Sequence, residues 1–209
     1  MSLELLELSV RRGGVALFPP LSLQVAGGAV AAVMGPSGVG KSTLLDAIGG
    51  HLAHGFSLTG RVLVQGRDVT ALPAEARRIG VMFQDALLFP HLSVGDNLAF
   101  GLPAAVRGRA VRQAAVEAAL AQAGLEGMYG RDPATLSGGQ RARAALMRAL
   151  LAEPLALLLD EPFSKLDAAL RGEMRRFLFG HLRARGIATL MVTHDPEDAA
   201  EAGGAVVVL

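Results

Sequence analysis

The sequence contains no cysteine and no tryptophan, and only 4% of its residues are aromatic. Without cysteine it can form no disulfide and perform no thiol chemistry, which is compatible with the cytosol. Its formal net charge is +1, so it lacks the strong positive charge typical of nucleic-acid binding, and no nucleic-acid partner is expected. Apolar runs such as residues 155–159 are far shorter than the roughly 20 residues that span a bilayer. Any role at a membrane would therefore need other chains.

The N-terminus also lacks the basic n-region of a signal peptide, and it carries Glu4 and Glu7 instead. The 209 residues are 51% hydrophobic and 19% charged, a composition typical of a globular protein. This length suits one sizeable domain better than two, so residues 1–209 are expected to form a single domain.

Lysine is rare as well, and one of the two lysines stands in the most informative stretch of the chain. Residues 35–42 read GPSGVGKS, which matches the phosphate-loop pattern G-x-x-x-x-G-K-[ST]. Glycines let backbone N–H groups approach a phosphate, while Lys41 supplies a compact positive charge and Ser42 a hydroxyl that can bind Mg²⁺. The nucleotide-binding residues predicted from this stretch are Gly35, Pro36, Ser37, Gly38, Val39, Gly40, Lys41, Ser42 and Thr43.

A buried strand before this loop and a helix after it provide the expected context, with the positive end of the helix facing the anion. The alternative is a glycine-rich turn that carries a lysine by chance.

The remaining pattern predicts an α/β fold built on a mainly parallel sheet, because apolar strands alternate with helices. Strands of this sheet are expected at residues 30–34, 79–83, 155–159, 188–193 and 206–209. Three earlier strands lie close together with little helix between them, which predicts an N-terminal antiparallel subdomain; they are residues 3–10, 21–25 and 60–66. A mainly helical segment, about residues 85–150, is expected as an insertion in the core. Helices are predicted at residues 107–123, at 140–152 and from Asp167 to Gly186.

Two adjacent acids, Asp160 and Glu161, follow the apolar strand 155–159. Ligands of open parallel sheets bind at the carboxyl ends of the strands. Asp160 is therefore predicted to join Ser42 in holding Mg²⁺, and Glu161 to orient or deprotonate an attacking water. The alternative is that Asp160 only begins a turn before Pro162.

Residues 136–140 read LSGGQ and place a hydroxyl and two glycine amides at a helix start. Alone, this pentapeptide could be no more than a helix cap. Between the phosphate loop and the Asp160–Glu161 strand, however, it makes the chain resemble the ATP-binding subunits of ABC transporters over essentially its whole length. The resemblance implies a P-loop NTPase core and an ATPase that uses ATP and Mg²⁺.

The resemblance also implies roles for single residues. Gln84 corresponds to a glutamine that contacts Mg²⁺ and water and senses the permease. The signature residues Ser137, Gly138, Gly139 and Gln140 would close on ATP bound by a second copy in a head-to-tail dimer, and Asp167 would work across that interface. His194 would contact the γ-phosphate; read without the family, it is a histidine at a strand end beside a helix cap.

The segment of residues 83–102 resembles that of importers, in which such a loop packs on a permease helix. The loop around Leu87 to Leu92 is therefore expected to dock transmembrane permease subunits, with packing on the chain's own helices as the alternative. The resemblance further implies a periplasmic or extracellular substrate-binding protein, and a peripheral position at the cytoplasmic face of the plasma membrane.

Two features depart from the family pattern. The aromatic residue that usually stacks on adenine is missing: Arg12 occupies the matching region, and Phe18 is the nearby aromatic. An arginine can stack through its guanidinium. The sequence also ends at Leu209 without a regulatory domain, so it resembles the short subunits of thiamine- or iron-type importers.

Other P-loop classes fit less well. A guanylate-kinase-like enzyme has a similar loop and length but needs neither LSGGQ nor His194. A non-transport ABC ATPase of DNA repair would carry long heptad-rich insertions, and one of translation would join two such domains. A GTPase needs N-K-x-D, but Asn97 is the sole asparagine.

Overall fold

A computed structural model describes residues 2–85 and 87–209. Met1 and Ala86, the latter in the loop predicted to dock a permease, lie outside the described residues. None of the helices within the described ranges is long and apolar enough to cross a membrane.

A parallel sheet forms the centre of the fold, as predicted, with the strand order β10-β4-β9-β8-β7. All four pairings between neighbours in this sheet are parallel. Its strands are β4 (Val30–Met34), β7 (Ile79–Met82), β8 (Ala156–Asp160), β9 (Ala188–Val192) and β10 (Gly203–Val208). Because parallel strands end at the same edge, the residues that follow β4, β8 and β9 are brought close together.

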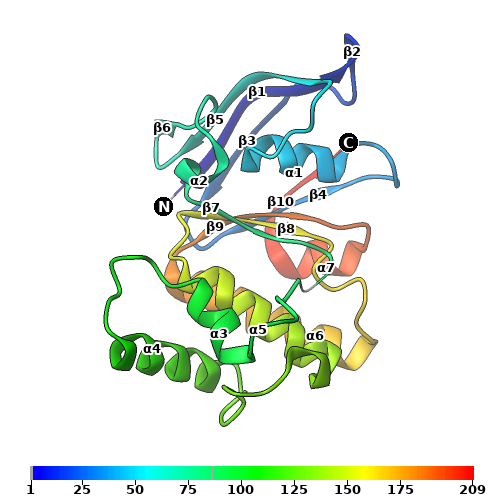
Figure 1. The fold of residues 1–209 in the computed structure, drawn as a ribbon. Helices are drawn as coiled ribbons and strands as arrows, with labels where there is room; N and C mark the ends of the chain where they lie inside the picture. Colours follow the sequence, from blue (N-terminus) through cyan, green and yellow to red (C-terminus); the bar gives the residue numbers. More distant parts are fainter. Residues whose placement is uncertain (1, 86) are drawn as a thin grey trace.

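An antiparallel sheet forms from the N-terminal part of the chain, which confirms the second half of the fold prediction. Its central strand β1 (Ser2–Arg12) pairs with β2 (Val15–Ala16), β3 (Leu21–Ala26) and β5 (Phe56–Val64), and β6 (Arg67–Asp68) extends it beyond β5. Figure 1 shows this sheet and α1 (Lys41–Gly49) on one side of the parallel sheet.

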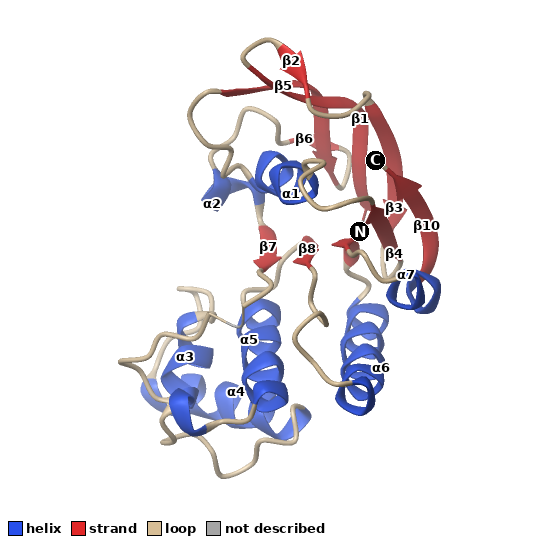
Figure 2. Ribbon diagram, turned by 90° about the vertical axis from the view of Figure 1, so that its right-hand side faces the viewer, coloured by secondary structure: helices blue, strands red, loops and turns tan. Residues whose placement is uncertain are grey.

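Most of the other helices cover the opposite face of the parallel sheet (Figures 1 and 2). Those between β7 and β8 form the predicted helical insertion: α3 (Val94–Phe100), α4 (Arg109–Gln122), the 3₁₀ helix η1 (Pro133–Thr135) and α5 (Gly138–Leu151). The helices that follow β8 and β9 are α6 (Ala168–Arg185) and α7 (Pro196–Ala202); a single turn, α2 (Ala74–Arg77), precedes β7.

Two apolar cores result, one on each face of the parallel sheet. In β8, Leu157 and Leu159 pack toward the helices, whereas Ala156 and Leu158 pack toward α1 and the antiparallel sheet. This alternation explains why the strand reads as one continuous apolar run, since both of its faces are buried. Double burial fixes the strand, and with it the acidic residues at its end.

Several predicted boundaries were wrong. Helix α5 begins at Gly138 rather than Gln140, because Ser137 is already its N-cap. The helix predicted over residues 107–123 is Arg109–Gln122. Strand β5 begins at Phe56 rather than at residue 60, and β2, β6 and α2 were not predicted.

Candidate functional site

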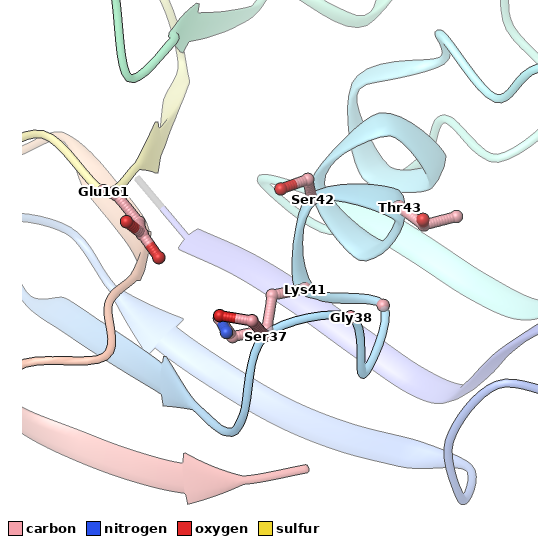
Figure 3. A pocket seen from close by; sticks show the side chains of 7 residues that line it. Ser37, Gly38, Lys41, Ser42, Thr43 and Glu161 are labelled. Carbon is pink, nitrogen blue, oxygen red and sulfur yellow. The ribbon is translucent and has the colours of Figure 1, made fainter.

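A pocket opens where β4 gives way to α1. Its lining comes from the loop between these elements, from the first turn of α1 and from the residue after β8; it consists of Ser37, Gly38, Gly40, Lys41, Ser42, Thr43 and Glu161. Figure 3 shows Glu161 across this pocket from Lys41 and Ser42. The strand–loop–helix context predicted for the phosphate loop is thus present.

Glycine is required in this loop by its backbone conformation. Gly38 has a φ of 84° and Gly40 a φ of 106°, values that residues with a Cβ rarely adopt. A Cβ on Gly40 would also lie 3.4 Å from both Leu17 and Phe18. The loop can therefore turn sharply and direct backbone N–H groups toward an anion at the start of α1.

Lys41 is buried at the start of α1. Its Nζ atom donates hydrogen bonds to the carbonyl oxygens of Gly35 at 2.8 Å and Pro36 at 3.0 Å. The ammonium group thus braces the loop and also lines the pocket. Gly35, Pro36 and Val39 shape the loop without lining the pocket.

Asp160 ends β8 beside Ser42. Burial raises the pKa of the Asp160 carboxyl and the charge of Glu161 adds to the rise, whereas a hydrogen bond with Ser42 and the charge of Lys41 act against it. Within residues 2–85 and 87–209, no group of three or more His, Asp or Glu side chains could hold a metal. The Asp160 carboxylate and the Ser42 hydroxyl beside it are oxygen donors of the kind that Mg²⁺ takes together with substrate phosphates and water.

Glu161 and His194 meet at the carboxyl edge of the parallel sheet. His194 Nδ1 lies 3.1 Å from Glu161 Oε1, and the histidine side chain is 60% exposed. Glu161 adopts a φ of 44°, which is strained for a residue with a Cβ. Its N–H donates to the Val192 carbonyl at the end of β9, 3.0 Å away. The backbone therefore turns sharply here and directs the carboxylate at the pocket.

Gln84 lies outside the phosphate pocket. Its Nε2 atom donates to Ser164 Oγ at 3.2 Å, and the neighbouring Asp85 forms an ion pair with Lys165. Gln84 instead lines a second pocket that includes Gly138 and Arg141. Its predicted contact with Mg²⁺ stays a prediction.

The LSGGQ segment caps a helix in this structure. Ser137 Oγ accepts from the Gln140 N–H, and Gln140 Oε1 accepts from the Ser137 N–H at 3.0 Å, which makes a capping box. Gly139 is buried, and a Cβ there would lie 2.8 Å from Leu170 of α6. Ser137 and Gly138 are exposed. Their predicted phosphate contacts therefore remain predictions that need a partner.

Asp167 is the N-cap of α6 and accepts from the Leu170 N–H at 2.9 Å. Its side chain is exposed. This geometry accounts for its place at the helix start, and its role across a dimer interface stays a prediction.

Of the two residues expected near the adenine base, Arg12 is exposed and Phe18 is not. Phe18 is buried. The Arg12 guanidinium carbon lies 5.4 Å from the centre of the Phe56 ring, in cation–π geometry. The Phe18 ring is therefore not accessible for stacking on adenine, and the Arg12 guanidinium already packs on the Phe56 ring.

Two sets of contacts escaped the sequence analysis. Arg171 and Arg175 of α6 form ion pairs with acids around α7, and Asn97 binds the loop before α3. The sequence does show two arginines at helical spacing in α6 and several acids at the start of α7. Spacing within each helix does not show, however, that the two helices contact each other.

Comparison with known proteins agrees with a nucleotide-binding site at this position. Residues 18–164 match the family model described as "ABC transporter". The chain is 51% identical over 191 residues to the uncharacterized ABC transporter ATP-binding protein YnjD of Escherichia coli, covering 91% of this chain and 88% of that protein. It is 49% identical to the thiamine import ATP-binding protein ThiQ of Cereibacter sphaeroides, over 80% of this chain and 71% of the relative.

It is also 46% identical to the sulfate/thiosulfate import ATP-binding protein CysA of Caulobacter vibrioides, over 90% of this chain. The match covers 56% of that relative, so the chain spans little more than half the length of some proteins that it matches. The family match favours the ABC ATPases over the nucleotide-kinase alternative. Together, the phosphate loop, the acidic strand end and these matches place the chain in the ABC transporter ATP-binding family, whose members are ATPases.

Proposed function

We propose that this chain is the ATP-hydrolysing subunit of an ABC importer, with residues 1–209 acting as one ATP-binding domain. Its relatives ThiQ and CysA are named as import ATP-binding proteins. Transport is favoured over the non-transport alternative because these names describe transport, and because the chain has no long heptad-rich insertion.

In this proposal the phosphate loop and α1 bind the triphosphate of ATP. Ser42 and Asp160 hold Mg²⁺, with Gln84 as a further contact, and the bound ion would neutralise charge on the phosphates. Glu161 orients or deprotonates the attacking water. His194, in contact with Glu161, contacts the γ-phosphate.

One observation carries the dimeric arrangement. Gly138 of the LSGGQ segment lines a different pocket from the phosphate loop of the same chain. A second copy arranged head to tail would bring its exposed Ser137 and Gly138, and its Asp167, to the first copy's nucleotide. Each complete site would then contain residues of both copies.

The ATPase rate per mole of chain is therefore expected to rise with protein concentration. A site that needs two copies is completed only when the copies meet, so total activity should increase faster than linearly in the dilute range. Phosphate release measured over a dilution series tests this. A strictly linear dependence down to dilute monomer would contradict the shared site.

The loop between β7 and α3, together with Phe100 of α3, is the proposed permease-docking surface. Its exposed apolar side chains are Phe83 at 45%, Leu87 at 56% and Phe100 at 68% exposure. Leu88 and Phe89 are half-buried, and Phe89 packs edge-on against Phe100 with ring centres 4.8 Å apart. Both interpretations, permease docking and packing on the chain's own helices, thus have support. Phe89 packs on α3, whereas Phe83, Leu87 and Phe100 are exposed.

Asn97 holds this loop in place. The amide is fully buried, its Oδ1 accepts from the Phe89 N–H at 2.7 Å, and its Nδ2 donates to the carbonyls of Phe89 and Ser93 at 3.1 and 3.0 Å. Replacing Asn97 with Leu removes the hydrogen-bond partner of the Phe89 N–H, at about 1–3 kcal/mol where water cannot reach it, whereas the carbonyls of Phe89 and Ser93 still accept from backbone N–H groups. We expect a lower unfolding temperature and faster amide exchange at Phe89. Unchanged exchange there would show that the loop does not depend on Asn97.

Docked in this way, the chain would lie peripherally at the cytoplasmic face of the plasma membrane. It would couple ATP hydrolysis to separate transmembrane permease subunits, and a periplasmic or extracellular substrate-binding protein would deliver the solute.

A further inference from the structure

The loop that carries His194 is held from both sides. Before His194, the Thr193 hydroxyl donates to Asp198 Oδ2 at 3.2 Å and accepts from the Asp195 N–H at 3.0 Å. After it, Asp195 accepts from the Glu197 N–H at 2.8 Å and caps α7. The histidine side chain itself extends outward to Glu161. Its position is therefore set by its neighbours in the chain.

Helix α6 contacts Asp195 and α7 through two arginines four residues apart, Arg171 and Arg175, which lie on one face of the helix. Arg171 pairs with Asp195, and the buried Arg175 donates to Asp198 at 2.7 Å. Arg175 also binds Glu197 and Glu201, at 2.9 and 2.7 Å. Arg175 thus ties α7 to α6 as a whole, whereas Arg171 is directed at the residue next to His194.

Arg171 depends on this contact. Among the described residues, its Nε atom is buried and has no hydrogen-bond partner. Its guanidinium instead donates through Nη1 to Asp195 Oδ2. The Glu197 N–H holds the pKa of Asp195 below its ordinary value, and the charge of Arg171 acts in the same direction. The Asp195 carboxylate is therefore bound both by backbone N–H groups of α7 and by the Arg171 side chain of α6.

Helix α6 is also connected to Glu161, the residue that His194 contacts. It begins at Ala168, with Asp167 as its N-cap, shortly after Glu161 in the chain, and the Glu161 carbonyl accepts from the Ser164 hydroxyl at 3.0 Å within that connecting segment. A closed path of contacts thus runs from Glu161 through α6, Arg171 and Asp195 to His194, and back to Glu161.

We propose that Arg171 is a positioning residue for His194, which it holds against Glu161 through the ion pair with Asp195. This inference rests on the catalytic role proposed for His194. Arg171 does not line the phosphate pocket, so its effect on hydrolysis passes through the histidine loop.

Arg171→Gln is the principal test in the purified full-length chain. We expect kcat for MgATP to fall by up to about 100-fold, the loss that a misplacement of about 1 Å in a catalytic group can cause. KM for MgATP should change little, because the phosphate loop is untouched. Arg171→Lys keeps the charge and should recover part of the loss.

Glu173→Gln is the matched control. It breaks an ion pair on the same helix, but that pair faces Arg143 of α5 instead of α7. We expect a wild-type kcat.

Asp195→Asn provides an independent route to the same contact, since asparagine caps a helix about as well as aspartate but cannot form the ion pair. It should reproduce the Arg171→Gln defect, and it tests the role of the Arg171–Asp195 ion pair even if Arg171→Gln does not fold.

Repeating the Arg171→Gln substitution in a His194→Ala variant distinguishes a positioning role of Arg171 from a general loss of stability. In a His194→Ala chain, Arg171→Gln should cause no further loss, because the side chain it positions is gone. Equal losses with and without His194, or a wild-type rate for Arg171→Gln and Asp195→Asn, would overturn the positioning role. A wild-type rate for His194→Ala alone would instead refute the role proposed for the histidine.

Discussion

Replacing Glu161 with Gln is expected to abolish most ATP hydrolysis while preserving MgATP binding. The amide has the size of the carboxylate but cannot take a proton, and general-base roles are typically worth about 10²–10⁴-fold in rate. Lys41, Ser42 and Asp160 are unchanged, so the groups proposed to bind phosphate and Mg²⁺ remain in place. Glu161 faces them across the pocket (Figure 3), where a water could stand between it and a bound phosphate.

Two measurements separate binding from turnover. Phosphate release should fall within the stated range, while the affinity for a fluorescent ATP analogue should stay near the wild-type value. Trapped ATP should also prolong the closed dimer, which size-exclusion chromatography with MgATP can detect. Glu117→Gln, an exposed glutamate in α4, is the control and should hydrolyse normally. Near-normal turnover of Glu161→Gln would move the base to another group, with His194 the first candidate.

The phosphate loop could be predicted from sequence because its signals are local. A short apolar strand, three glycines and a helix start follow one another within a few residues, and the backbone angles of Gly38 and Gly40 show why glycine stands there. Helix α6 was equally accessible, because Asp167 and Gly186 cap its two ends. Features of this kind depend on residues that are neighbours in the chain.

Strand β5 shows how a local signal can mislead. Gly60 indicated the start of a strand, yet it lies inside one and opposes a register shift in β1. A Cβ there would come within 2.3 Å of the Glu7 carbonyl oxygen, so glycine permits the close approach of the bulged strands. The reason for a glycine at position 60 is therefore the partner strand β1, which lies more than fifty residues away in the sequence.

Contacts within the candidate site also depended on such distant partners. The family resemblance implied that Gln84, Glu161 and His194 gather at one site, and the structure brings Glu161 to His194 but directs Gln84 to Ser164. The pairing of Arg171 with Asp195 requires the register between α6 and α7, which follows from packing on the sheet. Side-chain direction, rather than spacing, determines these contacts.

Replacing Leu87 with Asp is expected to prevent assembly with the permease and to leave the ATPase activity of the free chain nearly intact. Leu87 is exposed, so a charge there costs little in the free chain. In a desolvated contact, however, the carboxylate would be unpaired, and burying an unpaired charge typically costs several kcal/mol. The phosphate pocket is formed by other elements and should not be affected directly.

The structure identifies Leu87 as a better probe than Phe89. The Phe89 ring packs on Phe100, and the Arg148 guanidinium carbon lies 5.1 Å from its centre, so Phe89→Asp would disturb the loop itself and confuse folding with docking. Phe100→Asp, at the most exposed aromatic of this surface, offers a second probe from α3; because it also removes the ring contact with Phe89, its result is compared with that of Leu87→Asp, which keeps this contact. Val111→Asp places the same charge on another exposed apolar residue, in α4, and controls for the charge alone.

Co-purification with the cognate permease and phosphate release by the free subunit together decide the matter. We expect Leu87→Asp and Phe100→Asp to lose the permease, and Val111→Asp to retain it, with all three free subunits hydrolysing ATP at near wild-type rates. Should both probe variants still co-purify at wild-type yield, the exposed side chains beside α3 do not contact the permease. The loop would then serve only to pack against its own helices, as the contacts of Phe89 and Asn97 already do in part.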